Sequence, residues 1–426
     1  MDLTVQDNMI RRKTVKINDL LILCFAAWPF FWNLWVSLKV TTNFSYFLPR
    51  VLLAVLTVLF CLKRRTFTKS ALFIWIPVFI AFVISGFRGN FSTALADIIV
   101  LLCGFIICLA EERRNINSTL IMQCMFVIGF FVAITVLADA VTGLFYRRLL
   151  SLYTQSAQTV MYKRNIRIST GGILPHTASA GCFICSGLAA NFFLQKTKKS
   201  NHTGSIRILI FIISILILQK RGFLLDIVLT VFFMWIFSWR FTKNERVKLR
   251  KQMMFAFTII VLCVVAGLLY YYVPMVQFYT DSLLNRFTNS EGTLSGRTLL
   301  YSLALSFFRR NPLLGIGWGK FRGYTQGIFS QYSTSTYEVH NVYLQLLCET
   351  GIIGLVTFIT AVGTTLFHSI KKYRSFINAG FTERQFQAVR LGLFLQLFFI
   401  FYCLSGNPLY DYNFLITYFI GILLTL

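Results

Sequence analysis

Residues 206–239 read IRILIFIISILILQKRGFLLDIVLTVFFMWIFSW, an apolar run whose polar centre is Gln219-Lys220-Arg221-Gly222. A helix needs about 20 apolar residues to cross the hydrocarbon core of a bilayer, so this run is too long for one crossing. Two short helices that meet at Gly222 explain both the length and the polar centre, because glycine permits a tight turn. The stretch therefore predicts two membrane-spanning helices, over about 206–219 and 222–239, joined at the outer membrane boundary.

The whole chain has the same apolar character. Of its 426 residues, 56% are hydrophobic and 16% aromatic, and the mean hydropathy is +0.68. Soluble globular proteins contain roughly 45–50% apolar residues, so this composition excludes a soluble protein. Repeated apolar runs of bilayer length predict an all-α polytopic membrane protein of about twelve transmembrane helices. The spans cover about 19–38, 46–62, 71–86, 92–110, 119–142, 172–194, 206–219, 222–239, 253–276, 342–367, 388–405 and 413–426.

Charge sets the predicted orientation of these spans. The formal net charge is +26, and basic clusters precede the first span and follow every even-numbered one. Lys and Arg are retained on the cytoplasmic side of a membrane, so both termini are expected there. Merging the seventh and eighth spans would break this alternation. The charge is thereby explained without a nucleic-acid partner.

We expect one membrane domain over 1–426, with the first apolar run retained as a span and not cleaved as a signal. Two connections on the outer side are long, about 143–171 and about 277–341, and the second makes a large extracytoplasmic loop between spans 9 and 10. The ten cysteines fall in or beside apolar runs, where they are expected to behave as small hydrophobes. The outer side shows neither a close carboxylate pair nor a His–carboxylate cluster, so neither a metal nor another cofactor is predicted.

The stretch SGRTLLYSLALSFFRRNPLLGIGWGKFRGYTQGIFSQYSTSTYEVHNVYLQLLCETG, residues 295–351, holds most of the chemistry that faces outward. Ser295 is a good N-cap for a helix over about 296–310, whose broad apolar side should lie on the protein or in the membrane interface. Asn311-Pro312 should end that helix, and three closely spaced glycines predict a flexible turn after it. The outer loop is therefore expected to be largely helical.

Thirteen cations face outward on this topology, where few carboxylates are available to neutralise them. Some are expected to be simply solvated, but those beside apolar structure need a partner. The planar fork of Arg donates paired hydrogen bonds to phosphate. These cations predict an anionic, plausibly phosphate-bearing ligand at the outer membrane face. They are Arg147, Arg148, Lys163, Arg164, Arg167, Lys220, Arg221, Arg286, Arg297, Arg309, Arg310, Lys320 and Arg322.

His340 is the candidate base. A lone histidine is usually structural, but this one lies on the outer side, at a predicted helix start, after the basic cluster. A helix N-terminus disfavours the imidazolium, and a neutral imidazole can accept a proton from a hydroxyl. His176 is a weaker candidate. Glu349 lies nine residues after His340. We expect it to hold an arginine in place or to stabilise helix packing, more than to take part in chemistry directly. Asp97 and Asp226 should be protonated or paired within the membrane.

The pattern SGR, NPLLGIGWGKF and HNVYLQLLCETGIIGL resembles the signature region of the O-antigen ligase and polymerase family over about 70 residues. RISTGGILPHTASAG resembles the family's Arg-Gly-Pro segment, with His176 where Asn is common. LQKRGFLL resembles its Ser-Arg turn, with Lys220 in place of a small residue. The resemblance implies a GT-C-like membrane glycosyltransferase that uses an undecaprenyl-pyrophosphate-linked glycan without a metal. It also implies that Arg221 and Arg297, with Arg167, bind the pyrophosphate and that His340 activates the acceptor hydroxyl.

The leading hypothesis is a polymerase that joins lipid-linked repeat units into O-antigen, capsule or exopolysaccharide at the outer face of the bacterial cytoplasmic membrane. We expect Arg167, Lys220, Arg164, His176, Asn341 and Glu349 to bind substrate. The expected partners are the glycan donor, its acceptor and the bilayer, with a chain-length regulator and a flippase beside them. A ligase that moves the glycan to lipid A-core or protein is the alternative within the family. A lipid-linked oligosaccharide flippase is the alternative of another class, but transporters place polar sites at the bilayer midplane. A purely structural membrane protein leaves the outward arginines unexplained.

Overall fold

The protein is described by a computed structural model over residues 3–39, 47–62, 71–111, 117–166, 169–195, 203–242, 244–272, 277, 280–281, 294–329, 337–379 and 382–426. Within these ranges the chain is helical and no strand occurs, apart from one isolated bridge between Leu38 and Tyr153. The predicted all-α fold class is confirmed.

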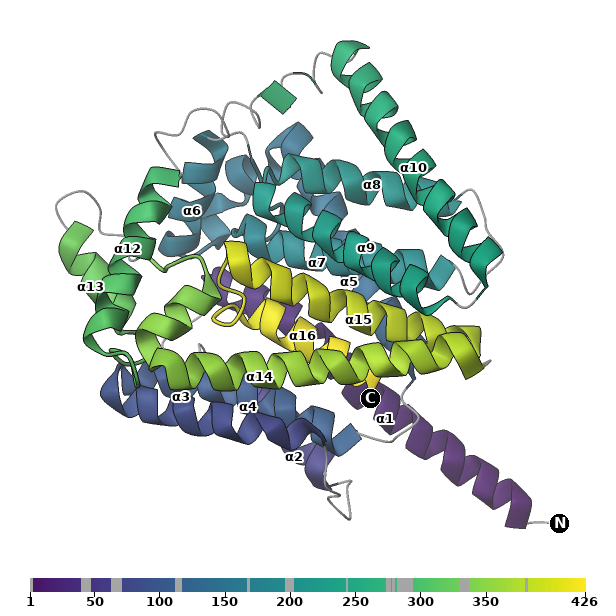
Figure 1. Cartoon of the computed structure of the whole chain (residues 1–426), viewed down its shortest axis with the longest axis horizontal. Coiled ribbons are helices and arrows are strands. Elements are labelled where there is room, and N and C mark those ends of the chain that lie inside the picture. The colour runs from purple at the N-terminus through teal and green to yellow at the C-terminus, as the bar shows by residue number, and fades with distance from the viewer. Residues whose placement is uncertain are drawn as a thin grey trace.

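Most helices run along one direction and form a bundle (Figure 1). Seven described helices are long and apolar enough to cross a membrane, and four shorter apolar helices accompany them. The bundle is that of a polytopic membrane protein. The helices are α1 (Leu3–Ser37), α2 (Leu48–Leu62), α3 (Ile76–Arg88, after the 3-10 turn Ala71–Trp75), α4 (Phe91–Glu111), α5 (Ser118–Thr142), α6 (Gln155–Ile166), α7 (Thr177–Gln195), α8 (Thr203–Ile217), α9 (Arg221–Phe241), α10 (Glu245–Tyr272), α12 (Leu294–Arg310), α13 (Lys320–Phe329), α14 (Val342–Ala379), α15 (Glu383–Ser405) and α16 (Tyr412–Thr425).

A helix coincides with each of the predicted spans, with differences at the ends. α14 continues to Ala379, beyond the expected 367, and α10 begins at Glu245, before the expected 253. α12 begins at Leu294, two residues before the expected start, so Ser295 lies in its first turn and the expectation that it is the N-cap was wrong. Helix ends extend freely beyond a membrane because water satisfies the terminal backbone groups.

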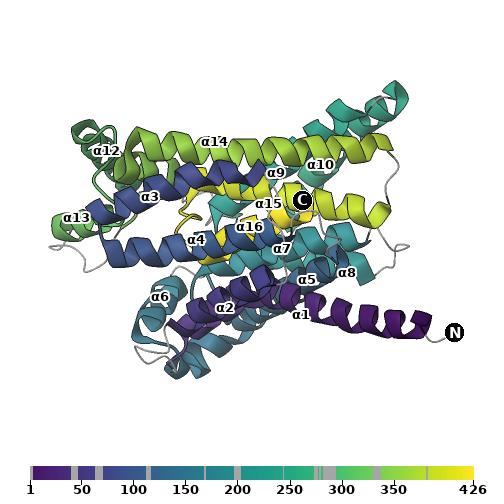
Figure 2. The ribbon, with the colours of Figure 1, turned by 90° about the horizontal axis from the view of Figure 1, so that it is seen from below.

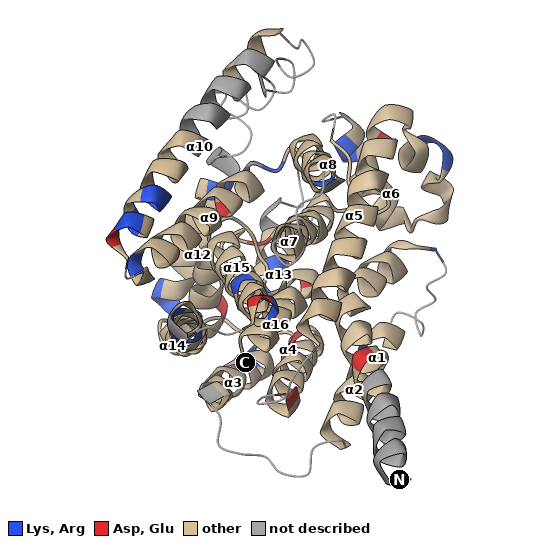
Figure 3. Ribbon diagram, turned by 90° about the vertical axis from the view of Figure 1, so that its right-hand side faces the viewer, with Lys and Arg blue, Asp and Glu red and all other residues tan. Residues whose placement is uncertain are grey.

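The bundle has two distinct ends. α6, α12 and α13 gather at one end in both views, together with residues 406–411; we call this the loop end (Figure 2). The end of α9, the start of α10, the end of α14 and the start of α15 lie at the opposite end, where Lys and Arg are frequent; we call this the basic end (Figure 3). The charge pattern predicts that the loop end faces outward.

α16 forms the centre of the bundle, since every residue from Tyr412 to Thr425 is buried. Below the loop end, the ring of Tyr402 on α15 stacks with Phe414 on α16 at 4.5 Å and with Phe223 on α9 at 4.8 Å between centroids. Aromatic pairs at such distances each contribute roughly 0.5–1.5 kcal/mol beyond area burial. This stack fixes the start of α9 against α15 and α16.

α14 is broken at Gly351, which has φ 67° and ψ −168°. The break leaves a short helical piece from Val342 to Thr350 at the loop end, followed by the long span. A helix break frees backbone groups, which must find partners inside the protein when water is absent. The turn after α12 supplies them: Ile316 N donates to Cys348 O at 2.9 Å, and Ile352 N donates to Pro312 O at 2.9 Å.

The glycine turn at 315–319 is therefore held on two sides. On one side, Gly317 N donates to Glu349 O of α14 at 2.9 Å. On the other side, Trp318 N donates to Ser85 O of α3 at 3.1 Å, and Trp318 O accepts from Asn90 N, between α3 and α4, at 2.8 Å. The expectation of a flexible turn was wrong, because its backbone completes the broken helix α14. The loop end thus rests on a fixed base.

The intramembrane acids are paired, as expected. Asp97 accepts hydrogen bonds from Trp318 Nε1 at 2.9 Å and from Tyr412 OH at 2.8 Å. Asp226 accepts from Ser405 Oγ at 3.2 Å. These bonds join α4, α9 and α15 to segments of the loop end.

Candidate active site

The turn between α8 and α9 is one half of the site. Lys220 occupies the N-cap position of α9, and Gln219 before it has a φ of 50°. A Cβ at Gly222 would lie 2.9 Å from Ser405 Oγ, so the turn rests on the last residue of α15. Arg221 is the first residue of α9, which places its backbone at the loop end as the sequence predicts.

The segment around His340 is the other half. Asn341 caps the short piece of α14 at the loop end, because its Oδ1 accepts from Leu344 N at 3.0 Å. Its Nδ2 donates to Leu404 O at 3.2 Å. Leu404 and Ser405 are adjacent, so the segment of His340 and the turn of Lys220 meet at the same end of α15.

His340 and Gln219 share an uncommon backbone. Within the described residues they are the two non-glycine residues with positive φ, at 59° for His340 and 50° for Gln219. Such conformations cost on the order of 1–3 kcal/mol and persist only where the surroundings impose them; they cluster at functional sites. Both lie in the segments that meet at α15.

Two cations act on His340. The pKa of His340 is lowered to about 4. Burial is the largest cause, followed by the positive charges of Arg297 on α12 and of Lys220. Desolvation and nearby positive charge both disfavour the imidazolium. His340 is therefore a neutral imidazole at neutral pH, able to accept a proton, and it lies within electrostatic reach of two groups that can bind an anion.

His176 extends the site to the start of α7. Although the residue reaches the molecular surface, burial of its ring and the charges of Arg164 and Lys220 lower the pKa of His176 to about 4. Arg164 lies on α6 and lines a recess of about 590 Å³ together with Thr170 and Pro175. Lys220 thus connects the surroundings of His340 with those of His176.

Asp411 brings a carboxylate to the same place. It is the N-cap of α16 and accepts from Asn413 N at 3.1 Å and from Asn413 Nδ2 at 2.8 Å. Burial raises the pKa of Asp411 to about 6, against the opposing effects of the Asn413 bonds and the Lys220 charge. The sequence analysis gave Asp411 no role; its position directly before an apolar run is an N-cap signal that marks it.

The backbone on either side of His340 is clamped. Glu338 forms an ion pair with Arg322 of α13 and accepts a hydrogen bond from Asn407 Nδ2. Val339 N donates to Gln345 Oε1 at 3.3 Å. The sequence did not single out Glu338 for a role, because its partners come from two remote segments.

Glu349 lies beneath this assembly. Its carboxylate is buried and accepts from Phe321 N at 3.3 Å and from Tyr410 OH at 3.1 Å. These bonds hold the start of α13 and the 406–411 segment against α14, which agrees with the expected role in packing. Direct contact of Glu349 with a substrate stays a prediction.

The structure thus brings Lys220, Arg297 and His340 together, with Asn341 beside them and His176 and Arg164 on the far side of Lys220. Arg167 lies outside the described residues. Among the residues that the structure does describe, no three His, Cys, Asp or Glu side chains gather as a metal site would require.

Fold and site define a helical, multi-pass membrane protein with a basic, histidine-containing site at one end of its bundle. Residues 206–359 match the family model described as O-Antigen ligase. The chain is 26% identical over 102 residues to the Exopolysaccharide production protein ExoQ of Rhizobium meliloti (strain 1021). That alignment covers 22% of this chain and 23% of the relative. Both comparisons support membership of the O-antigen ligase/polymerase family, and the alignment with the curated relative spans about a quarter of that relative's length.

Proposed function

We propose that this chain is a membrane glycosyltransferase that polymerises undecaprenyl-pyrophosphate-linked repeat units into O-antigen, capsule or exopolysaccharide. The observation that carries the proposal is the convergence of Lys220 and Arg297 on a neutral His340 at the loop end. The family match over 206–359 supports the lipid-linked glycan as donor. The site would face outward from the bacterial cytoplasmic membrane, with both termini inside and no metal in the reaction.

In this mechanism the pyrophosphate of the donor binds Arg297, Lys220 and Arg221, with Arg167 as a further ligand. A hydroxyl of the acceptor glycan attacks the anomeric carbon of the donor while its proton passes to His340. The bond between that carbon and the pyrophosphate oxygen breaks, and the electron pair stays with the leaving group. The cations stabilise the charge as it develops, and this kind of electrostatic stabilisation is usually the largest single catalytic term.

Purified protein supplied with lipid-linked repeat units alone tests this proposal. We expect a ladder of longer lipid-linked chains from the wild type and none from His340→Ala or Arg297→Ala. His368→Ala is the matched control, since His368 lies on α14 away from the site with its Nδ1 against Thr364 O at 2.8 Å. Chain growth by His340→Ala at the wild-type rate would overturn the assignment of the base.

A ligase remains the second candidate because the family description itself names one. A deletion strain separates the two by its lipid-linked glycans. Accumulated single repeat units would indicate the polymerase, whereas accumulated long polymer would indicate a ligase acting on lipid A-core or protein. Loss of glycan from the outer face, with repeat units retained inside, would instead indicate the flippase.

A further inference from the structure

A second cluster of cations lies at the basic end, away from the candidate active site. Arg390 on α15 stands over the rings of Phe193 and Phe386, with its Cζ 5.1 and 5.6 Å from their centroids. Its Nη1 donates to Gln387 Oε1 at 3.3 Å, and its Nε is buried with no acceptor among the described residues. A guanidinium has five N–H donors, so most of the N–H groups of Arg390 have no acceptor among the described residues.

Lys251 on α10 lies at the same end of the bundle. Its Nζ donates to Thr242 Oγ1 at 2.7 Å, to Ser238 Oγ at 3.0 Å and to Ser238 O at 3.3 Å, which fixes the ammonium at the end of α9. The end of α9 also reaches the rings beneath Arg390, because Phe241 lies 6.3 Å from Tyr373, which stacks with Phe386 at 5.7 Å between centroids. The positive charge of Arg390 acts on Lys251. Glu383 is a carboxylate that acts on Arg390, and it also accepts a hydrogen bond from Gln387 Nε2. Arg390 and Lys251 repel each other, and an anion that contacts both would relieve this repulsion.

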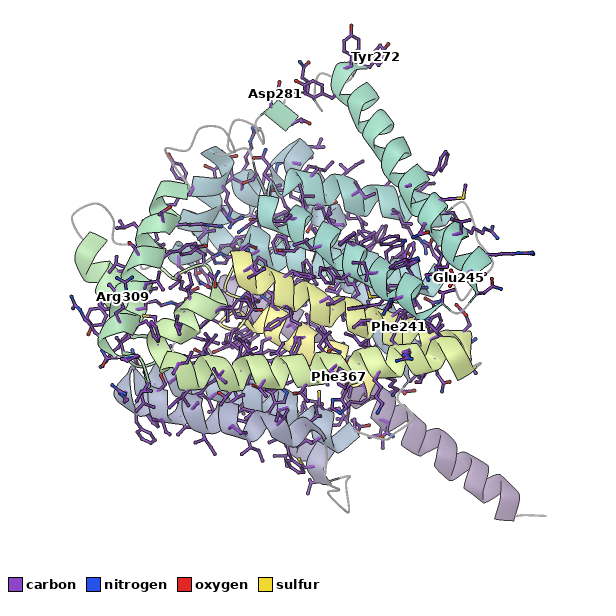
Figure 4. All side chains as sticks on the ribbon, in the orientation of Figure 1. Phe241, Glu245, Tyr272, Asp281, Arg309 and Phe367 are labelled. Carbon is purple, nitrogen blue, oxygen red and sulfur yellow. The ribbon has the colours of Figure 1, made fainter. Side chains whose placement is uncertain are left out.

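The surroundings fit the boundary between lipid head groups and acyl chains. Lys248 Nζ lies 5.2 Å from the ring centroid of Trp239, whose indole Nε1 is buried and has no acceptor among the described residues. Trp and Lys are enriched at this level of a membrane. Figure 4 labels Phe241 and Glu245 at this same end of the bundle.

An exposed apolar surface leads away from the cluster along α9. Only 22% of the Gly222–Phe241 span is buried, the lowest share among the seven candidate spans, and Val231 and Phe232 on it are 48% and 40% exposed. Acyl chains would cover this face. A head group at the level of Lys251 would place its chains beside it.

We propose that Arg390 and Lys251 bind the phosphate of an anionic phospholipid in the leaflet at the basic end. The remaining N–H groups of the Arg390 guanidinium donate hydrogen bonds to the phosphate oxygens, and Lys251 adds a second positive charge. Basic pockets between membrane helices on the cytoplasmic side are suited to such head groups. This site is separate from glycan transfer and does not depend on the proposed function.

Thermal unfolding of the purified full chain in detergent tests the site, with phosphatidylglycerol, phosphatidylethanolamine or inorganic phosphate added separately. We expect phosphatidylglycerol to raise the unfolding temperature and the other two to leave it nearly unchanged. Arg390→Gln and Lys251→Gln should each weaken the apparent affinity for phosphatidylglycerol at least tenfold. Arg384→Gln, which removes an exposed cation from the same helix, is the matched control.

Each outcome decides the proposal. An equal rise with inorganic phosphate would assign the cluster to a free anion and overturn the lipid site. An unchanged response to phosphatidylglycerol in both variants would overturn the roles of Arg390 and Lys251. Size-exclusion profiles and the unfolding temperature without lipid establish that each variant folds, and Arg390→Lys, which keeps the charge but not the fork, should bind with intermediate affinity.

Discussion

His340 adopts a left-handed backbone, and its neighbours hold it there. Its φ of 59° is unfavourable for a residue with a side chain, while Glu338 and Asn341 on either side are tied to α13, α15 and the 406–411 segment. Strain of this kind is retained where it positions a functional group. The sequence identified the histidine, but its orientation depends on contacts with remote segments.

The pKa of His340 predicts how catalysis depends on pH. Because this pKa is lowered from 6.5 to about 4, the base should stay unprotonated to about pH 5 and lose activity below that. Arg297→Gln removes a positive charge, so it should raise the pKa of His340, which an NMR titration of the His340 ring would measure without need of activity. Arg309→Gln, which removes an exposed cation from the same helix, should leave the pKa of His340 in place. An acid limb near pH 6.5 in the wild type would contradict this account.

The same shift has a consequence for stability. The unfolded chain binds a proton at His340 near pH 6.5, whereas the folded chain does so only near pH 4. The folded state therefore binds fewer protons in this window, and the contribution of His340 to stability is full above pH 6.5 and is lost as pH falls toward 4.

The clamp at Glu338 predicts coupled variants. Glu338→Gln removes the ion pair with Arg322, so His340 should lose its fixed position and kcat should fall about tenfold to a hundredfold, with KM little changed. Arg322→Gln should have a similar effect, and the double variant should be no worse than either single one. Arg310→Gln at the exposed end of α12 is the control. Additive losses in the double variant would show that the two residues act separately.

At the scale of elements, the broken helix α14 and the glycine turn complete each other. The sequence placed the turn after Pro312 and the span after His340, but gave no reason for the two to pair. Four backbone hydrogen bonds between the 312–317 and 348–353 segments now supply that reason. Backbone pairing leaves no side-chain pattern, so a single sequence does not reveal it.

Gly351→Ala tests this pairing. The φ and ψ of Gly351 fall in a region that is essentially restricted to glycine, and an added Cβ would lie 2.3 Å from Leu313 O. We expect a loss of roughly 3 kcal/mol or more, seen as a lower unfolding temperature in detergent. Gly363→Ala in the same helix has nothing within 4 Å of its added Cβ and should be neutral or stabilising by about 1 kcal/mol. Equal unfolding temperatures for the two variants would contradict the role of the break.

For the whole molecule, the distribution of charge predicts the orientation in the membrane. Alkaline phosphatase fused after Tyr162 on α6 or Gln326 on α13 should be active, because both exposed residues lie at the loop end. Fusion after Asn244, between α9 and α10, should be inactive. Activity at Asn244 together with inactivity at the other two would reverse the orientation and move the site to the cytoplasmic side.

The sequence by itself determined the class of protein and the approximate positions of the helices, and it marked Arg297, Lys220 and His340 as candidates, because apolar length, charge and residue type are local properties. Only the tertiary structure decided which of these residues share a site. The turn 219–222 and the segment 340–341 meet at the end of α15, because Gly222 packs against Ser405 and Asn341 donates to Leu404 O. The same holds for the turn at 315–319, which is held in place because it supplies the backbone partners that α14 loses at Gly351.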